Sequence, residues 1–220
     1  MNNSGKTVLV IGASGAFGSA IVTRLLSEGY SVLAAARNTD AIPDGPLKLK
    51  LDLEDQNSID LVVNYLLEQN APLAGIIQAA GVVGFGKVTE TSASAAQRLM
   101  QVNNLGPANL ISRLKPLLQE ESFVISITGV VAERVFPGMV AYCTSKMAFA
   151  AFLAGINTEW RRDKIQIVDA RPGHTETGLA SRAIFGTAPA FPEGMTKEHV
   201  IDVLFTGLAE GKGIIASSEF

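Results

Sequence analysis

Short, unbroken apolar runs alternate along this chain with longer stretches in which apolar residues recur every three or four positions. An apolar run bounded by turn residues is typical of a strand buried on both faces, and the wider spacing is typical of an amphipathic helix. The apolar runs predict strands at residues 8–11, 31–36, 47–51, 74–79, 122–127, 165–170 and 213–216. The amphipathic stretches predict helices near residues 17–29, 57–67, 92–118, 142–161 and 197–210.

Strands and helices alternate through the whole chain, so we expect a parallel sheet with helices on both faces. The predicted fold class is α/β: one Rossmann-type, doubly wound domain of residues 1–220 with about seven strands. The strand order should reverse near the first strand, which places a ligand outside the carboxyl ends of the strands. Residues 178–196 are rich in Gly and Pro and are expected to form a flap on the substrate side.

Capping and backbone rules add two details to the helices. Asn57 is expected to cap the second helix, with Asp60 three residues later as a variant of the capping box. Gly106 and Pro107 are expected to bend or interrupt the long 92–118 region.

Composition narrows the class of protein. The 220 residues are 47% hydrophobic and 18% charged, which suits one compact domain. The net charge of −3 does not point to a nucleic-acid partner or an anionic membrane surface. We find no signal peptide, and no apolar run approaches the ~18 residues that a membrane span needs. The single cysteine, Cys143, fits a reducing, cytoplasmic location, and with two distant histidines it offers no metal site.

The first predicted strand runs directly into a glycine turn that suits a dinucleotide. Gly12, Gly15 and Gly18 recur at every third position, and the apolar spacing from Phe17 onwards opens a helix. Glycines let the backbone approach a pyrophosphate, which the N–H groups and dipole of a helix N-terminus attract. We therefore assign Gly12, Ser14, Gly15, Phe17 and Gly18 to cofactor binding. The alternative is a tight turn that binds nothing.

The end of the second strand indicates which nucleotide is bound. An acidic residue there bonds the ribose 2′-hydroxyl of NAD, whereas an arginine accommodates the 2′-phosphate of NADP. This strand ends at Arg37, with no carboxylate until Asp40, and arginine can grip a phosphate with two hydrogen bonds. The sequence thus predicts NADP(H) over NAD(H). Asp52, after the third strand, has two candidate roles: a bond to the adenine amino group, or a cap for the following turn.

Tyr142 and Lys146 stand four residues apart in a predicted helix, and this spacing places both side chains on one face. A tyrosine with a pKa near ~10 exchanges protons poorly at neutral pH. A neighbouring ammonium favours the phenolate and lowers that pKa toward the working range. The pair is therefore a candidate proton donor and its modulator, although surface contacts with the same spacing are common.

Taken together, these motifs make the chain resemble the short-chain dehydrogenase/reductase (SDR) family over nearly its whole length. The residues that carry the resemblance are the glycine turn, Asp52, Ala79-Ala80-Gly81, the 102–106 segment, Tyr142 with Lys146, and Pro172-Gly173 followed by Thr177. The resemblance implies a doubly wound sheet and hydride transfer between a nicotinamide cofactor and a carbonyl or alcohol.

The resemblance also gives roles to individual residues by position. It implies that Tyr142 is the general acid in reduction, and that Lys146 bonds the nicotinamide ribose and lowers the tyrosine pKa. It implies that Asn103 holds a water in the proton relay to Lys146. The further residues assigned to the cofactor are Arg37, Asp52, Leu53, Ala79, Ala80, Gly81, Tyr142, Lys146, Pro172, Gly173, Thr175 and Thr177.

Three features depart from the family pattern. The glycine spacing, G-x-x-G-x-x-G, is the one used by the longer "extended" members. Gln78 stands where an asparagine is usual, so bonds that brace the central strand are expected to be lost. Gly129 stands where the family has the serine that polarises the substrate oxygen. Either Thr128 supplies the hydroxyl, which we favour, or the enzyme works without it.

These residues favour an NADP(H)-dependent oxidoreductase that interconverts a small-molecule carbonyl and an alcohol, with Tyr142, Lys146, Asn103 and Thr128 as its catalytic residues. A second hypothesis is a nucleotide-binding sensor or scaffold with weak or no catalysis, which Gly129 supports. A third, an isomerising SDR, rests only on the glycine spacing. The resemblance also suggests a homodimer or homotetramer, and the sequence leaves the substrate open.

Overall fold

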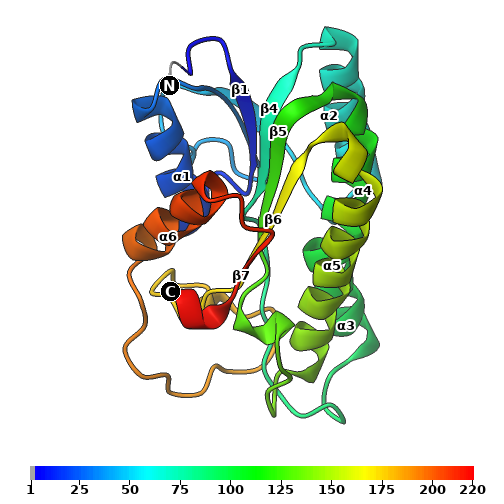
Figure 1. Cartoon of the computed structure of the whole chain (residues 1–220). Coiled ribbons are helices and arrows are strands. Elements are labelled where there is room, and N and C mark those ends of the chain that lie inside the picture. The colour runs from blue at the N-terminus through cyan, green and yellow to red at the C-terminus, as the bar shows by residue number, and fades with distance from the viewer. Residues whose placement is uncertain (1–2) are drawn as a thin grey trace.

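A parallel sheet runs through the centre of the computed structural model, which describes residues 3–220 (Figure 1). Its strands are β1 Thr7–Ile11, β2 Ser31–Ala36, β3 Leu47–Lys50, β4 Leu73–Gln78, β5 Leu118–Ile127, β6 Gln166–Ala170 and β7 Ile214–Ile215. Their order is β3-β2-β1-β4-β5-β6-β7, and every observed pair is parallel. The order reverses beside β1, as expected, so the predicted doubly wound fold of about seven strands is confirmed.

Helices cover both faces of this sheet. They are α1 Ala16–Ser27, α2 Gln56–Gln69, α3 Ala93–Met100, α4 Gly106–Arg113, α5 Val140–Glu159 and α6 Lys197–Ala209. Helices α1 and α6 lie on one face, and α2, α4 and α5 lie on the other (Figure 1). Within residues 3–220, none of the helices combines the length and the apolar character needed to cross a membrane.

The core is divided by the sheet into two apolar clusters, and β1 contributes to both. Leu9 and Ile11 point into the cluster beneath α2 and α5, whereas Val8 and Val10 point into the cluster beneath α1 and α6. Side chains alternate between the faces of a strand, so a strand covered on both sides has to be apolar at every position. The unbroken apolar run in the sequence has this cause.

The predicted 92–118 helix contains a π turn that ends immediately before Gly106. After α3 the chain forms a π turn, Gln101–Leu105, before α4 begins. A Cβ at Gly106 would lie 2.7 Å from the carbonyl oxygen of Leu53 and 3.0 Å from that of Gln101, so this turn passes very close to its neighbours. Pro107 follows without a backbone N–H, and because Leu105 and Gly106 keep right-handed helical backbone angles, the chain passes directly into α4.

The predicted cap of α2 is wrong. Asp55, two residues before Asn57, is the N-cap, and its carboxylate accepts a hydrogen bond from the Asn57 backbone N–H at 2.9 Å. Asp60 instead uses its carboxylate for Gln56 and Arg113. Strand boundaries differ by a few residues at most, and the largest difference is β5, which begins at Leu118 rather than at 122.

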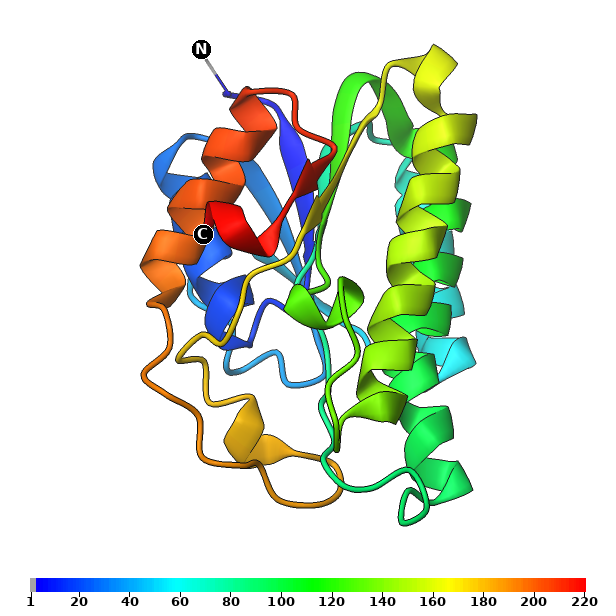
Figure 2. The same ribbon diagram turned by 60° about the horizontal axis from the view of Figure 1, so that its bottom comes forward.

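Three loops gather at the carboxyl ends of the strands, on one side of the molecule (Figure 2). They follow β4, β5 and β6, and the third contains the flap, which we define as residues 178–196. The flap is closed at its base, where Thr175 bridges Met195. The flap therefore lies at the same edge of the sheet as the carboxyl ends of the strands, where a ligand is expected to bind.

Candidate active site

The turn between β1 and α1 is packed so tightly that two of its glycines leave no room for a side chain. Gly12 has a φ of +84°, and a Cβ there would lie 2.6 Å from the amide nitrogen of Ala80. A Cβ at Gly18 would lie 2.1 Å from the carbonyl oxygen of Gly12. Gly15 is the N-cap of α1, and the first turn of the helix carries no acidic side chain. The positive end of the helix dipole is thus left for an anion. The two further predicted residues of this turn, Ser14 and Phe17, are half-buried.

At the end of β2, Arg37 lies beside an acidic residue that the sequence analysis missed. Its guanidinium Nη1 is 3.6 Å from Oε1 of Glu54, and Nε of Arg98 donates to the same oxygen at 2.9 Å. The Arg37 side chain is 57% exposed. An exposed ion pair of this kind contributes less than about 1 kcal/mol, so Arg37 can exchange Glu54 for a phosphate at little cost. Glu54 and Arg98 come from other elements, so no local motif signals them.

Asp52 caps a turn, which is one of its two candidate roles. Its Oδ1 accepts a hydrogen bond from the backbone N–H of Glu54 at 3.0 Å, and its own N–H donates to the Ser58 hydroxyl at 2.9 Å. Leu53 is buried, and its carbonyl accepts a bond from Gln101 Nε2 at 2.9 Å. These bonds fix the loop beside Arg37, and a bond from Asp52 to adenine stays a prediction.

The end of β4 is braced by Gln78, contrary to the expectation that this residue would leave it unbraced. The Gln78 side-chain amide bonds both the N–H and the carbonyl of Ala80, each at 3.2 Å. The Ala79 N–H donates to the Ile11 carbonyl at 2.9 Å. The Gln78 side chain bonds backbone two residues further along its own strand end, and so it stabilises the turn although it stands where the family usually has an asparagine. Ala80 is held close to Gly12 as a result.

Asn103 is buried within the π turn and connects the loop after β4 to α5. Its Oδ1 accepts from the Val82 N–H at 2.9 Å, and its Nδ2 donates to the Val82 carbonyl at 2.9 Å and to the Ser145 hydroxyl at 3.0 Å. A Cβ at Gly81 would lie 3.3 Å from Asn103 Oδ1 and 3.4 Å from Lys146 Nζ. The structure therefore brings Asn103 and Lys146 together beside Gly81, and the relay predicted between Asn103 and Lys146 stays a prediction. π turns of this kind occur frequently at functional sites.

Tyr142 and Lys146 lie in the first two turns of α5 and are both buried, with 8% and 6% of their surfaces exposed. The Lys146 ammonium donates to the Ile127 carbonyl at 3.0 Å. Burial lowers the pKa of Lys146 to about 8, against an opposing contribution from the charge of Asp169. Burial also raises the pKa of the Tyr142 phenol, and Cys143 adds to that rise.

The predicted lowering of the Tyr142 pKa by Lys146 is not observed in this structure: burial of the phenol raises the pKa, Cys143 adds to the rise, and Lys146 is not among the causes of the shift. At neutral pH the phenol is therefore protonated, and Lys146, with a pKa of about 8, is mostly an ammonium. A protonated phenol is the form that can donate a proton to a carbonyl oxygen.

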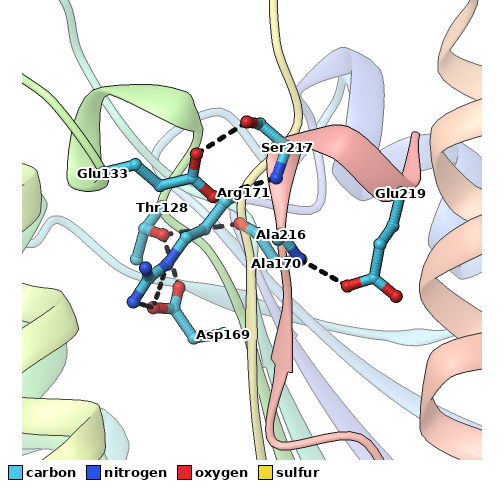
Figure 3. A network of polar contacts seen from close by, with 8 residues as sticks. All are labelled: Thr128, Glu133, Asp169, Ala170, Arg171, Ala216, Ser217 and Glu219. Carbon is cyan, nitrogen blue, oxygen red and sulfur yellow. Dashed lines mark hydrogen bonds and ion pairs between the residues drawn. The ribbon is translucent and has the colours of Figure 1, made fainter.

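Thr128 turns away from the role predicted for it. It is 1% exposed, and its hydroxyl donates to Oδ1 of Asp169 on the neighbouring strand β6 (Figure 3). Arg171 holds the other carboxylate oxygen, Oδ2, through Nε at 2.8 Å and Nη2 at 2.7 Å. Gly129 has a φ of +87°, where a serine would be strained. This geometry disfavours Thr128 as the donor to the substrate oxygen.

The same polar cluster reaches the C-terminal residues. Glu133 accepts hydrogen bonds from the backbone N–H of Ser217 at 2.9 Å and from its hydroxyl at 2.6 Å (Figure 3). Although burial opposes it, these bonds hold the pKa of Glu133 below its usual value. No motif in the sequence predicted this cluster. Its local signal is a charged residue, Asp169, among the buried positions of a strand, since a buried charge needs a partner.

Residues 172–177 lead from β6 into the flap along a closely bonded backbone. The Pro172 carbonyl accepts from the Val130 N–H at 2.9 Å, and the Thr177 N–H donates to the Thr175 carbonyl at 2.8 Å. The Thr175 hydroxyl donates to the Gly173 carbonyl at 3.1 Å. The predicted cofactor residues of this segment thus stand at the entrance of the flap. Among residues 3–220, no group of three or more His, Cys, Asp or Glu side chains is placed to hold a metal.

The model of one protein family, described as short chain dehydrogenase, matches residues 6–184. A dehydrogenase/reductase SDR family protein 7-like of Anopheles gambiae is 29% identical over 205 residues, which are 86% of this chain and 65% of that protein. The glycine betaine reductase ATRR of Emericella nidulans is 29% identical over 188 residues, 80% of this chain but 15% of that protein. The chain thus spans less than two thirds of these two relatives.

A third relative is matched over most of its own length. The NADP-dependent 3-hydroxy acid dehydrogenase of Schizosaccharomyces pombe is 23% identical over 232 residues, with 96% of this chain and 90% of that protein covered.

Solved structures share the fold over almost the whole chain. A short-chain dehydrogenase of Sphingobium yanoikuyae in complex with NADPH superposes with a TM-score of 0.85 at 21% identity, covering 96% of this chain and 87% of that one. One of Burkholderia cenocepacia in complex with NADP gives 0.84 at 21% identity, covering 98% and 89%. At these identities the likeness concerns the fold alone.

Proposed function

Because the chain belongs to the short-chain dehydrogenase family, we propose that it is an NADP(H)-dependent oxidoreductase that interconverts a carbonyl and an alcohol. One observation carries this proposal: the buried pair of Tyr142 and Lys146 in α5, with Asn103 and Gly81 beside the ammonium. A protein that only bound a nucleotide would have no use for a buried phenol one helical turn from a buried amine, since both are costly to bury.

The residues at the carboxyl ends of β1 and β2 fit a dinucleotide with a 2′-phosphate. At Gly12 and Gly18 a side chain would collide with backbone, so the turn keeps the bare surface that a pyrophosphate needs. Arg37 is exposed and pairs with Glu54 at 3.6 Å, so its guanidinium is accessible to a phosphate. The NADPH and NADP named for two structures of the same fold, and the NADP-dependent relative, support the same cofactor.

The chain's own residues would divide the proton chemistry between them, while the nicotinamide, when bound, supplies or accepts the hydride. In reduction, Tyr142 gives its phenolic proton to the carbonyl oxygen. The raised pKa keeps this proton in place until the oxygen becomes basic enough to take it. The Lys146 ammonium then stabilises the phenolate that remains. Asn103 holds the loop and α5 in register, and its role in a water relay stays part of the proposal.

The test is NADPH oxidation against a panel of small aldehydes and ketones, with wild type and Tyr142→Phe compared. Loss of a general acid lowers turnover by about 10²- to 10⁴-fold, and NADPH affinity should be kept because the ring remains. Tyr65→Phe, on the partly exposed surface of α2, is a matched control that should change neither quantity. Full turnover by Tyr142→Phe would overturn the proposed mechanism.

A second candidate, a nucleotide-binding sensor or scaffold, is favoured by the end of β5. Gly129 has no hydroxyl, and the Thr128 hydroxyl is bonded to Asp169. Neither of these two residues therefore supplies the hydroxyl that the family's serine directs at the substrate oxygen. The same panel separates the two candidates. Tight NADPH binding without turnover of any carbonyl would establish the sensor and exclude the oxidoreductase.

We further propose that the protein assembles as a homodimer or homotetramer through the outer face of α4 and α5. A hollow of about 400 Å³ lies there, lined mainly by Phe152, Ile156 and Trp160 together with Lys115. Mass measurement by light scattering after size exclusion would test this, and a monomer at every concentration would contradict it. The expected cytoplasmic location stays a prediction.

A further inference from the structure

The flap is fastened to the loop after β4 by two backbone hydrogen bonds. The Ile184 N–H donates to the Val83 carbonyl at 2.8 Å, and the Phe85 N–H donates to the Phe185 carbonyl at 3.0 Å. The ring of Phe191, also in the flap, lies 6.1 Å from that of Phe85. Figure 2 shows the orange flap crossing toward the green loops that follow β4 and β5. The flap is therefore docked at its tip as well as closed at its base.

The docking of the flap depends on Gly84, because the Phe185 ring occupies the space that a side chain would need there. A Cβ at Gly84 would lie 2.0 Å from Cε1 of the Phe185 ring, and one at Gly86 would lie 3.5 Å from Cε2. The Phe185 ring is thus seated directly on the backbone of the loop after β4. A side chain at Gly84 would lift this ring, and with it the flap, unless the ring moved.

The docked flap completes a cavity of about 240 Å³. Its walls come from the three loops at the strand ends, and its principal lining residues are Phe85, Gly86, Pro137, Met139, Thr187 and Pro189. Thr187 and Pro189 belong to the flap, so the cavity exists in this form only while the flap is docked. None of the described residues that line it carries a charge.

The cavity is also linked to the proposed proton donor. The Met139 carbonyl accepts the Cys143 N–H at 2.8 Å, which fixes Met139 at the start of α5, one turn before Tyr142. Phe85 and Tyr142 belong to the same apolar cluster. A cavity of about 150 Å³ is enough for a benzene ring, so this one has room for a substituted ring or a branched alkyl group.

We propose that this cavity selects the substrate by taking its uncharged, apolar part, and that Phe185 seated on Gly84 assembles it. The proposal rests on the proposed function, because the carbonyl of that substrate would face Tyr142. An ionised group placed among Phe85, Met139 and Pro189 would lose its water without gaining a partner, which is strongly unfavourable. Anionic carbonyl compounds should therefore be poor substrates.

The first experiment compares kcat/KM for benzaldehyde and 4-carboxybenzaldehyde, with NADPH in excess. Wild type should prefer the neutral aldehyde by at least about tenfold. Thr187→Arg places a cation at the cavity wall, and a charge-assisted hydrogen bond should shift that ratio toward the acid by about tenfold or more. Thr187→Val, which stays neutral, and Ser181→Arg, which puts the same charge on the flap outside the lining, should keep the wild-type ratio.

The second experiment tests the assembly of the cavity. Gly84→Ala and Phe185→Ala should each raise KM for benzaldehyde several-fold and leave KM for NADPH unchanged, because both disturb the docked flap only. The double variant should be no worse than either single one, since residues that act through one contact are not additive. Additive losses would show that Gly84 and Phe185 act separately.

The outcomes separate this inference from the proposed function. If benzaldehyde is reduced and Tyr142→Phe abolishes the reaction, but Thr187→Arg leaves the substrate ratio unchanged, the cavity does not select and the inference falls alone. An equal kcat/KM for the two aldehydes in wild type has the same meaning. If wild type binds NADPH but reduces no carbonyl, the proposed function and the inference both fail.

Discussion

The carboxyl ends of β1, β5 and β6 lie at the same edge of the sheet, but different groups make the close contacts there. At the end of β1 the close contacts are made by backbone, and a Cβ at Gly18 would lie 2.1 Å from the Gly12 carbonyl oxygen. At the ends of β5 and β6 they are made by side chains, because Thr128, Asp169 and Arg171 bond one another (Figure 3).

This difference determines what a residue type can predict. Where the backbone comes close, glycine is the only residue that fits, so its presence in the sequence already specifies the structure. Where side chains make the contacts, the same hydroxyl can face a ligand or the core, and only the position of its partners decides between them. Thr128 was a sound candidate by position, and Asp169 directs it inward.

The largest effect is expected from Gly18→Ala, which tests the backbone side of this comparison. The added methyl would meet the backbone of Gly12 and Ala13, which cannot move without opening the turn. We expect a loss of about 3 kcal/mol or more, a fall in Tm of roughly 6 °C or more, and loss of NADPH binding. Gly155→Ala in α5, where a Cβ would contact nothing within 4 Å, should instead stabilise the protein by about 0.5–1 kcal/mol. Equal effects of the two substitutions, measured by thermal unfolding, would contradict the comparison.

The next largest effect is expected from Asp169→Asn, on the side-chain side. The substitution keeps the shape but removes the carboxylate that holds Arg171, of which only 19% of the side chain is exposed. Leaving a largely buried charge without its partner should lower the free energy of unfolding by about 3 kcal/mol. Asp202→Asn breaks an exposed pair with Arg24, and should cost less than about 1 kcal/mol. Denaturant unfolding of both variants checks this, and a cost for Asp169→Asn no greater than that of the control would mean the cluster contributes little.

The fold could be predicted from the sequence almost completely, because apolar periodicity records burial directly. β1 is apolar from Val8 to Ile11 since both of its faces are covered, and that pattern needs no tertiary knowledge. The family match confirms the resemblance that the motifs indicated. The cap of α2 was missed because Asp55 and Asn57 are both good caps, and the sequence alone does not choose between them.

The site could be predicted only in part, and the limit is long-range contact. Asn103 and Lys146, which the resemblance links, do lie together beside Gly81, because short turns fix where each strand and helix ends. Glu54 and Arg98, which meet at Arg37, come from separate elements and leave no spacing to find. The pKa of Tyr142 also depends on tertiary burial, so spacing gave the wrong direction.

A smaller effect is expected from Thr128→Val, which asks whether the hydroxyl serves the fold or the reaction. The variant removes the bond to Asp169, and should cost about 1.5–3 kcal/mol of stability because the acceptor is charged. Turnover at a temperature where the variant stays folded should be unchanged. Thr158→Val, which removes an exposed helical hydroxyl bonded to the Ala154 carbonyl, is the control and should change neither quantity appreciably. A large fall in kcat with unchanged stability would show that the Thr128 hydroxyl takes part in the reaction.

The smallest effect concerns the charge of Asp169, which acts on the pKa of Lys146. Burial lowers the pKa of Lys146 to about 8, and the charge of Asp169 acts in the opposite direction. In the proposed mechanism reduction requires the Lys146 ammonium, so kcat/KM should fall as the pH rises past about 8 and Lys146 loses its proton. Asp169→Asn removes the opposing charge, which lowers the pKa of Lys146 further.

We therefore expect the alkaline limb of the pH profile to move to lower pH in Asp169→Asn, by about one pH unit or less. The measurement is kcat/KM for one aldehyde from about pH 6 to about pH 10, normalised to each variant's maximum so that losses of stability cancel. Thr128→Val changes no charge and should leave the limb where it is in wild type. An unmoved limb in Asp169→Asn would show that its charge does not reach Lys146.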